Sequence, residues 1–406
     1  MNILHVTPHL GGGVGKAHAA LCAALPDDVQ QTFLLLEEPR DRRYADAIVS
    51  CGAQVRIARN LDEVALLARV ADIVQFEFWN HPRLFECLAR VDFPAIRSVF
   101  WSHVSGLFKP VIPAGLMKEA GRFAFTTEAS LAIPSLAELP PRKVAAINSG
   151  FGFVNSLPCL HNGVPRIAYL GTVDFVKMNP VFFDAVDALG GNIHVSIWGS
   201  CDPAGAVAAR ARAMNHPRRV RFHGHTDNPA HALAEADIFF YPLQPDHYGT
   251  AENALVEAMS LGLIPVVLDN PAETAIVRHD ENGLVAGSSG ECVALLQRLF
   301  ASPDLRRRLS RNAVRTAAAK SPAHSAQAFT TLWTALVAEA PQRPDFRSAV
   351  GGAPADWFLA TQRPPGADWA PSIVPEPACS KGTLAHFETV FAGDDSLARL
   401  RADMPA

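Results

Sequence analysis

The sequence predicts an α/β protein with two Rossmann-like parallel-sheet domains in tandem and a C-terminal extension. Its 406 residues are too many for one ordinary core and suit two domains plus an extra segment. Short, nearly continuous apolar runs alternate with helix-period segments through about the first 340 residues, which is typical of parallel strands covered on both faces. The alternation loosens at Leu157–Gly163 and restarts, so we expect domains over residues 1–156 and 165–340 and an extension over 341–406.

The first domain is expected to contain seven strands with helices between several of them. The strands are predicted at Asn2–Thr7, Thr32–Leu36, Gln54–Ala58, Ile73–Phe78, Ile96–Trp101, Arg122–Thr126 and Val144–Asn148. The clearest helical patterns are Lys16–Leu25, Leu61–Val70 and Pro82–Val91.

The second domain repeats this alternation and closes with two long helices. Its strands are predicted at Arg166–Leu170, His194–Trp198, Val220–Phe222, Ile238–Tyr241 and Ile264–Leu268. Its helices are predicted at Asn253–Leu261, Glu291–Ala301, Leu305–Ala319 and His324–Glu339. The extension is rich in Pro, Gly and Ala up to about Pro377 and regains apolar periodicity over Thr383–Phe391, which predicts one short docking helix.

Composition and patterning exclude several classes of protein. With 49% hydrophobic and 19% charged residues, the chain has ample apolar material for folded cores. A formal net charge of -4 argues against a nucleic-acid partner, since there is no basic excess to neutralise phosphates. The longest apolar stretch, Ala258–Leu268, is about half of the roughly 20 residues that span a bilayer.

The N-terminus and the cysteines predict a cytoplasmic protein. Met1–Thr7 has the pattern of a strand and not of a signal peptide, which also argues against a periplasmic binding protein. The seven cysteines are scattered without a CxxC pair, so we expect neither a disulfide framework nor a zinc cage.

A glycine-rich turn, Pro8–Lys16, follows the first strand and opens the first helix. It is not a P-loop, because Leu10 and Ala17 stand where that motif needs Gly and Ser or Thr, and it lacks the G-x-G-x-x-G spacing. A turn without a ligand is one interpretation. Ligands of open α/β sheets lie at the carboxyl ends of strands, however, so Gly12 and Gly13 are candidates for binding an anion.

The most informative segment runs from Tyr241 to Val267. A strand leads into a loop of small residues, and the loop starts a helix that ends at Gly262 before the next strand. Backbone N–H groups near Thr250–Asn253 are placed to bind an anion. Glu257 is one turn inside this helix, where a carboxylate can accept two hydrogen bonds from a vicinal diol such as ribose.

These residues resemble the GT-B glycosyltransferases of the large retaining, family-4-like branch. Residues 256–267 (VEAMSLGLIPVV) are similar to the second half of the family run E-x-F-G-x-x-x-x-E-A-M-A-x-G-x-P-V-V, with one extra residue before Pro265. Residues 271–285 resemble the E-I-V-x-x-x-x-N-G-L-L-V segment, residues 169–177 stand at the G-R-L-x-x-x-K-G loop, and residues 220–225 resemble V-x-F-x-G-x. The similarity covers about residues 1–340 and is most specific over 237–286.

The resemblance implies a GT-B fold whose two domains face each other across a cleft, with the donor mainly on the C-terminal domain and the acceptor on the N-terminal one. It implies transfer of a sugar, with retention, from a nucleotide-sugar donor to a hydroxyl acceptor that is a saccharide, lipid-linked or a small molecule. The nucleotide-sugar is a co-substrate, and neither a further cofactor nor a metal is expected.

The resemblance also assigns roles to individual residues. Glu257 would hold the ribose, Lys177 would pair with the diphosphate, and His103, after the fifth strand, would face the transferred sugar, so these three are the expected catalytic residues. A surface lysine and a structural histidine are the plain alternatives. The expected donor-binding residues are Gly12, Gly13, Gly171, Thr172, Lys177, Gly249, Thr250, Ala251, Glu252, Asn253 and Glu257.

The sequence departs from the family pattern at two positions. Gly249 stands where the first Glu of the run is expected, and Thr172 stands where the phosphate loop has Arg. Glu252 is the nearest carboxylate, at a spacing of five residues from Glu257 instead of eight. Two rival hypotheses therefore stay open: a homologue that binds a nucleotide or sugar without turnover, and a nucleotide-sugar epimerase, for which no carboxylate pair can be placed.

Several other clusters have a plainer interpretation. Asp246, His247 and His225 are interpreted as solvated loop residues, not as metal ligands. Glu128, at a strand end, is as well explained as the neighbour of a helix N-cap, and Trp79–His81 suits either the acceptor side or the core. Residues 107–121 combine lysines with apolar residues and are expected to form a cleft-side loop or a peripheral contact with a membrane.

Overall fold

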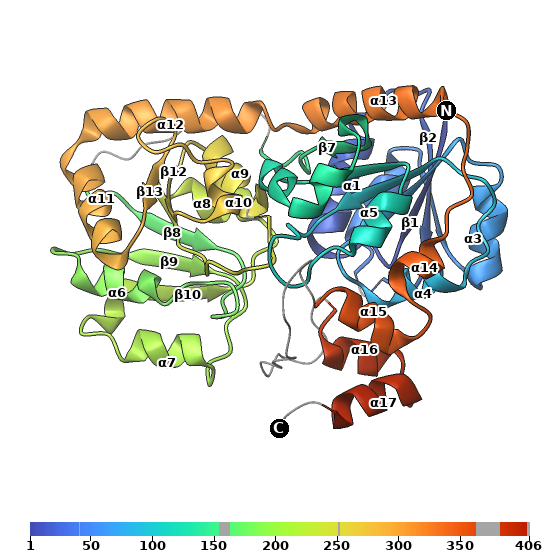
Figure 1. Ribbon diagram of the computed structural model, residues 1–406. Coiled ribbons are helices and arrows are strands. Elements are labelled where there is room, and N and C mark those ends of the chain that lie inside the picture. Colours follow the sequence, from blue (N-terminus) through green and yellow to red (C-terminus); the bar gives the residue numbers. More distant parts are fainter. Residues whose placement is uncertain (40, 154–162, 251, 363–381, 404–406) are drawn as a thin grey trace. The chain divides into compact units, whose positions relative to one another are not determined.

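The structure is a computed structural model that describes residues 1–39, 41–153, 163–250, 252–362 and 382–403 (Figure 1). The chain forms two compact units. The first contains Met1–Ser149 together with Pro322–Ala406, and the second contains Gly150–Ser321. The expected linker over 157–163 lies almost entirely outside the described residues.

The division differs from the expected one, in which the second domain extends to residue 340. Helix α13 (Pro322–Val337) belongs to the first unit because its apolar face is buried there. The indole Nε1 of Trp333 donates to Oε1 of Gln75 at 3.0 Å, and the ring of Phe329 lies edge-on to Trp101 with centroids 4.8 Å apart. The sequence predicted this helix from its periodicity, but periodicity does not show which of the two cores the helix covers.

The first unit is built on a seven-stranded parallel sheet of order β3-β2-β1-β4-β5-β6-β7. Its strands are β1 Asn2–Thr7, β2 Gln30–Leu35, β3 Gln54–Ile57, β4 Ile73–Phe78, β5 Ser98–Ser102, β6 Arg122–Phe125 and β7 Val144–Ala146. All seven expected strands are confirmed. The order reverses between β1 and β4, which makes their carboxyl ends the topological switch point of this sheet.

Helices cover the sheet of the first unit, and α13 lies beside α1. The helices that precede α13 are α1 Gly12–Cys22, α2 Arg43–Ser50, α3 Leu61–Ala68, α4 Pro82–Arg90 and α5 Ala114–Glu119, with 3₁₀ turns at Glu128–Ala132, Pro134–Glu138 and Pro141–Lys143. Helix α1 begins four residues before its predicted start at Lys16, so Gly12 and Gly13 lie in its first turn and not in a loop before it.

The extension forms four short helices among its described residues, where the sequence predicted one. They are α14 Phe346–Val350, α15 Pro354–Ala360, α16 Leu384–Val390 and α17 Asp395–Ala402. Side-chain N-caps start α14, α16 and α17, whose periodicity is too short to detect; Asp394 Oδ1, for example, accepts from the N–H groups of Ser396 and Leu397. The buried Phe346 and Phe387 attach the extension to the first unit, Phe387 beside Phe85 of α4 with centroids 6.1 Å apart.

The second unit is built on a six-stranded parallel sheet of order β10-β9-β8-β11-β12-β13. Its strands are β8 Ile167–Leu170, β9 Val195–Trp198, β10 Val220–Gly224, β11 Ile238–Tyr241, β12 Ile264–Leu268 and β13 Leu284–Ala286. Its helices are α6 Val181–Ala188, α7 Ala206–Arg212, α8 Pro229–Ala234, α9 Glu252–Ser260, α10 Pro271–Thr274, α11 Ser289–Ala301 and α12 Pro303–Ala318, with a 3₁₀ turn at Pro217–Arg219. The switch point of this sheet lies between β8 and β11.

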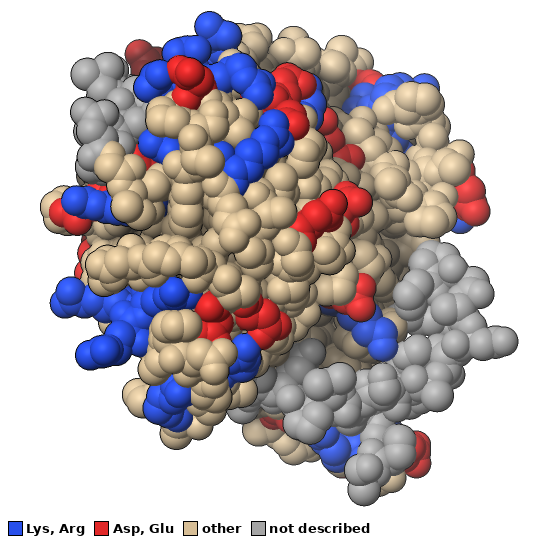
Figure 2. All heavy atoms as spheres, turned by 90° about the vertical axis from the view of Figure 1, so that its left-hand side faces the viewer, with Lys and Arg blue, Asp and Glu red and all other residues tan. Residues whose placement is uncertain are grey.

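The surface charges and the apolar character of the helices are those that the composition predicts. Acidic and basic side chains are interspersed over the face shown in Figure 2, as expected for 36 Lys and Arg against 40 Asp and Glu. Among the described residues, no helix combines the length and the apolar character needed to cross a bilayer.

The end of α9 is fixed by a glycine in the left-handed region. Gly262 has φ +83°, its N–H donates to Met259 O at 3.0 Å, and the N–H of Leu263 donates to Ala258 O at 3.1 Å. This is the Schellman pattern of helix termination. It turns the chain from α9 directly into β12 and so fixes the helix that carries Glu257.

We expect Gly262→Ala to lower the free energy of unfolding by about 1–2 kcal/mol, because a Cβ disfavours the left-handed conformation. The matched control is Gly290→Ala, in the first turn of α11 with open space around the added methyl group, which should be neutral or slightly stabilising. Urea denaturation measures both. Equal effects of the two substitutions would contradict the role given to Gly262.

Candidate active site

Two loops meet at the switch point of the second unit. The loop after β8 contains Lys177, and the loop after β11 runs from Pro242 to α9. They are joined through the backbone: the N–H of Gln244 donates to Lys177 O at 2.8 Å, and the N–H of Asn179 donates to Pro242 O at 3.0 Å. Gln244 Nε2 also donates to Phe175 O at 2.9 Å. The β8 loop and the β11 loop therefore form one hydrogen-bonded structure at the carboxyl edge of the sheet.

Lys177 is half-buried within this structure. Its ammonium lies 5.7 Å from the ring centroid of Tyr241, and its Cε is 3.8 Å from the position that a Cβ on Gly249 would occupy. Burial alone would lower the pKa of Lys177, but Tyr241, Tyr248 and Glu273 raise it above its ordinary value. The structure thus brings Lys177 and Gly249 together and keeps the lysine charged, ready to attract an anion.

The remaining donor-binding candidates of the second unit lie around the same loops. Glu257 is buried on α9, one turn beyond the loop, and Thr250 and Gly249 are buried before it. Thr172 is exposed, and Asn253 is exposed near the start of α9. Gly171 and Glu252 are at the carboxyl end of β8 and the first position of α9, whereas Ala251 lies outside the described residues.

A buried network that the sequence analysis missed holds the β11 loop in shape. Nε2 of His247 is 3.2 Å from Oε2 of Glu273, and Asn270 Nδ2 donates to the other oxygen of Glu273 at 3.0 Å and to Leu243 O at 3.2 Å. The N–H of Gly249 donates to Nδ1 of His247 at 3.1 Å. The interpretation of His247 as a solvated residue is wrong, although Asp246 and His225 are indeed exposed.

The hydrogen bonds of His247 also decide its chemistry. Because Nδ1 accepts the Gly249 N–H, the proton of the neutral ring is on Nε2, which donates to Glu273. A histidine in this state has no nitrogen lone pair left for a metal. Its function in the loop is to connect the backbone at Gly249 to a carboxylate on α10.

In the first unit, His103 is held by a buried carboxylate that the sequence analysis did not identify. Glu77, on β4, has no exposed surface and lies among three histidines: His103 Nε2 at 3.0 Å, His18 Nε2 at 3.0 Å and His5 Nδ1 at 3.2 Å. Gln75 Nε2 also donates to it at 3.0 Å. The signal in the sequence was a carboxylate, with Gln75 two residues before it, within a strand whose other residues are apolar.

Glu77, His5, His18 and His103 form a buried group that we call the Glu77 cluster. Burial alone would raise the pKa of Glu77, but the charge of His18 and the hydrogen bonds from the histidines hold it well below its ordinary value. Burial is the largest influence on the pKa of His18 and lowers it despite Glu77. A neutral His103 that donates from Nε2 to Glu77 presents Nδ1 as an acceptor, so its ring orientation and tautomer are both fixed.

The glycine turn belongs to the first unit, whereas the other donor-binding candidates belong to the second. Gly12 and Gly13 are exposed in the first turn of α1. The N-cap residue Gly11 offers no side-chain cap, and its N–H donates to Nδ1 of His9 at 3.0 Å.

Two further interpretations of the sequence can now be judged. Glu128 is exposed and follows Thr127, whose hydroxyl accepts from the N–H of Ala129 at 3.3 Å, so the N-cap interpretation is confirmed. Within 107–121 the apolar residues Val111, Ile112, Leu116 and Met117 are buried, and the lysines Lys109 and Lys118 are exposed.

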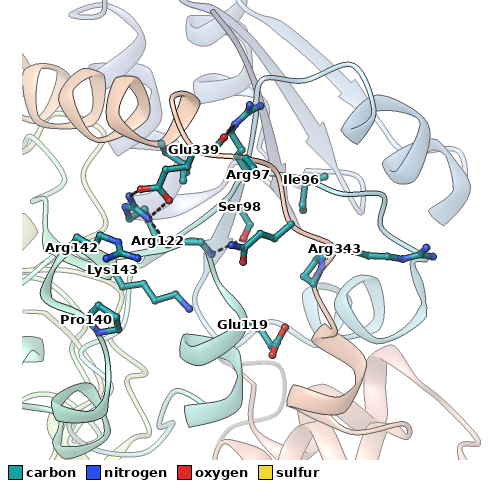
Figure 3. A pocket seen from close by; sticks show the side chains of 15 residues that line it. Ile96, Arg97, Ser98, Glu119, Arg122, Pro140, Arg142, Lys143, Glu339 and Arg343 are labelled. Atoms are coloured by element: carbon teal, nitrogen blue, oxygen red, sulfur yellow. Dashed lines mark hydrogen bonds and ion pairs between the residues drawn. The ribbon is translucent and has the colours of Figure 1, made fainter.

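A cavity of about 200 Å³ lies at the opposite, amino edge of the first sheet, where β5, β6 and the end of α13 meet (Figure 3). Much of its basic lining is already paired. Arg122 forms a bidentate ion pair with Glu339, Arg97 Nε donates to Glu339 O at 2.7 Å, and Arg343 pairs with Asp92. The contacts of Arg97 and Arg122 hold Glu339, just after α13, against the start of β5 and β6.

The comparisons with known proteins agree with this geometry. Residues 164–302 match the family model described as glycosyl transferases group 1. They contain Gly171, Thr172, Lys177, the β11 loop and Glu257, and the resemblance drawn from the sequence is confirmed for them.

Solved structures similar to the chain show its fold. A glycosyltransferase from Rickettsia africae matches with TM-score 0.68 and 12% identity over 83% of this chain and 99% of its own. Anabaena HepE, solved with UDP and glucose, matches with TM-score 0.66 and 14% identity over 82% and 100%. Sucrose-phosphate synthase from Thermosynechococcus elongatus matches with TM-score 0.63 and 16% identity over 83% and 99%. The chain has the GT-B fold, and the expected fold class is confirmed.

One curated relative is similar over a short stretch. Glycosyltransferase 1 domain-containing protein 1 from Xenopus tropicalis is 39% identical over 62 residues, which are 15% of this chain and 18% of the relative. The match thus spans less than a fifth of that protein.

We expect the Glu77 cluster to make stability depend on pH. Glu77→Gln should lower the free energy of unfolding by about 1–3 kcal/mol at pH 7, because hydrogen bonds to a buried charge are lost. A carboxyl group whose pKa is depressed by folding stabilises the fold above its unfolded pKa of about 4.3, and this contribution is lost as the pH falls through the folded value. The difference between wild type and Glu77→Gln should therefore shrink below about pH 4.

Urea unfolding followed by tryptophan fluorescence measures this difference at each pH. The exposed Glu38→Gln is the control and should change stability little at any pH. A Glu77→Gln difference that stays constant from pH 7 to pH 3 would contradict the cluster as described.

Proposed function

We propose that the protein is a glycosyltransferase that moves a sugar from a nucleotide-sugar donor to a hydroxyl acceptor with retention of configuration and without a metal ion. The observation that carries the proposal is the placement of a charged, half-buried Lys177 against the Gly249 loop, within the group 1 domain and at the switch point of its sheet. A switch point is where open α/β sheets bind nucleotides.

Each part of the second site has a task in this reaction. Lys177 and the backbone N–H groups that open α9 would neutralise the diphosphate as the bond between it and the sugar C1 breaks. Glu257 would accept hydrogen bonds from the ribose hydroxyls. The diphosphate leaves with the bonding electron pair, the acceptor oxygen forms the new bond to C1, and the hydroxyl proton is released.

The departures from the family pattern shape the proposal. Thr172 and Gly249 stand where the family pattern has Arg and Glu. Lys177 is therefore the principal cation of the β8 and β11 loops. The raised pKa of Lys177 supports this assignment, because the lysine stays charged at every physiological pH. HepE was solved with UDP and with UDP-glucose, which makes UDP-sugars the first donors to test.

The first unit would bind the acceptor and present His103 to the transferred sugar. Glu77 supports this assignment, because it fixes His103 with Nδ1 as an acceptor for a sugar hydroxyl. A cytoplasmic location and a peripheral contact with the inner face of a membrane stay predictions, and the burial of the apolar residues in 107–121 weakens the second.

We expect the wild type to release nucleotide diphosphate from one donor among UDP-, GDP-, ADP- and dTDP-sugars in the presence of EDTA. Lys177→Gln should lower kcat/KM about 10- to 100-fold, equivalent to the loss of about 1–3 kcal/mol of charge-assisted hydrogen bonding. Nucleotide release and the anomeric configuration of the product are both measured by NMR.

Lys320→Gln, a lysine outside the β8 and β11 loops, is the control for the loss of one positive charge and should leave kcat/KM unchanged. Binding of a donor without release would favour the homologue that lacks turnover. Recovery of an epimerised sugar nucleotide would favour the epimerase, and release that depends strictly on a divalent ion would contradict the metal-free mechanism.

A further inference from the structure

A series of hydrogen bonds connects helix α13 to His103. The indole Nε1 of Trp333 donates to Oε1 of Gln75 at 3.0 Å, and Nε2 of Gln75 donates to Oε1 of Glu77 at 3.0 Å. The other carboxylate oxygen of Glu77, Oε2, is 3.0 Å from Nε2 of His103. We call these four residues the Trp333 series. It joins a residue on α13, two residues on β4 and the residue that follows β5.

The direction of the bonds in the Trp333 series is fixed by its first donor. An indole nitrogen can only donate, so the atom of Gln75 that faces Trp333 is its carbonyl oxygen. The amide nitrogen of Gln75 then faces Glu77, which lies two positions further along β4 and therefore on the same face of the sheet. The reversed amide would place a carbonyl oxygen against the carboxylate and an N–H group against the indole N–H. Trp333 thus determines that Gln75 donates to Glu77.

The bond from Gln75 is one of the contacts that orient the carboxylate. Oε1 of Glu77 also has Nδ1 of His5 at 3.2 Å, and Oε2 has Nε2 of His18 at 3.0 Å beside His103. Gln75, Glu77, His5 and His18 have no exposed surface, so bulk water cannot take the place of a lost donor. Without the bond from Gln75, the carboxylate would lose one of the donors that hold it against His103.

A second contact of α13 reaches the same histidine through aromatic rings. Phe329, one turn before Trp333, lies edge-on to Trp101 with centroids 4.8 Å apart, and the ring of Trp101 is 4.6 Å from that of His103. Trp101 is also the residue of β5 that pairs with Glu77 in the register of the sheet. Helix α13 therefore contacts both supports of His103, Trp101 directly and Glu77 through the Trp333 series.

We propose that Trp333 is a positioning residue for His103. Its indole N–H holds the Gln75 amide so that Glu77 keeps the His103 ring with Nε2 as the donor and Nδ1 as the acceptor for a sugar hydroxyl. Trp333 is fully buried, so it acts only through the residues that it contacts. The use of His103 in catalysis rests on the proposed function, to which the proposal adds a residue 258 positions after Gln75 in the chain.

Histidine side-chain NMR tests the proposal without any substrate. The protein is prepared with isotope-labelled histidine, and the Nε2–H signal of His103 is assigned by its loss in His103→Gln. Trp333→Phe keeps an aromatic ring to stack on Phe329 and removes the indole N–H. We expect the His103 signal to shift, or to be lost through faster exchange with water, because Gln75 no longer holds Glu77 in place.

Trp357→Phe is the matched control. This indole is also buried and also donates one hydrogen bond, to Gly351 O at 2.9 Å within the C-terminal extension. The substitution should leave the His103 signal unchanged. Thermal melting shows whether each variant is folded.

A double substitution tests whether the effect passes through the amide. Gln75→Met keeps the length of the side chain and removes both of its hydrogen bonds in the series. In this background, Trp333→Phe should change the His103 signal no further. An additional change would overturn the proposal, since the influence would then pass through Phe329 and Trp101. An unchanged His103 signal in Trp333→Phe alone, or an equal change in Trp357→Phe, would overturn it as well.

Kinetics separate this proposal from the proposed function. With the donor found in the release assay, Trp333→Phe should lower kcat about tenfold, as expected for a displaced catalytic group. It should leave the KM of the donor unchanged, because the donor-binding residues of the second unit keep their contacts. A changed His103 signal with an unchanged kcat would confirm the positioning of His103 by Trp333 and contradict the role of His103 in the proposed function.

Discussion

Both units depend on one geometric constraint, the reversal of strand order in a parallel sheet. All strands of such a sheet end at the same edge, and where the order reverses, the two following loops leave in opposite directions. The second unit has this point between β8 and β11, where Lys177 and the Gly249 loop meet. The first has it between β1 and β4, where His9 and His81 meet Glu37. The chemistry of the chain is thus assembled from residues that are distant in sequence.

Buried carboxylates paired with histidines hold these loops in shape. Glu273 fixes the β11 loop through His247, and Glu77, on β4, fixes His103, which follows β5. A buried carboxylate is costly unless it is fully hydrogen-bonded, so each such residue strongly restricts its neighbours. In both cases the histidine is fixed as a donor from Nε2, which leaves Nδ1 to a backbone N–H in His247 and presents it as an acceptor in His103.

The sequence predicted the parts of this arrangement that are local. Apolar runs identified the strands of both sheets except β13, and the run around Glu257 identified the resemblance to the group 1 family. The pairing of His247 with Glu273 could not be predicted, because 26 residues separate them and their contact depends on the adjacency of β11 and β12. Neither could the return of α13 to the first unit, since periodicity gives the apolar face of a helix but not its partner.

The most direct test of the central claim is the affinity of the nucleotide for the second unit's switch point. Isothermal titration calorimetry with UDP and with UDP-, GDP-, ADP- and dTDP-sugars would be done on wild type, Glu257→Gln and Glu235→Gln, whose carboxylate is 77% exposed. The account predicts that one nucleotide series binds wild type and Glu235→Gln equally, and Glu257→Gln at least about tenfold more weakly. Equal affinity in Glu257→Gln, or no binding of any nucleotide, would contradict it.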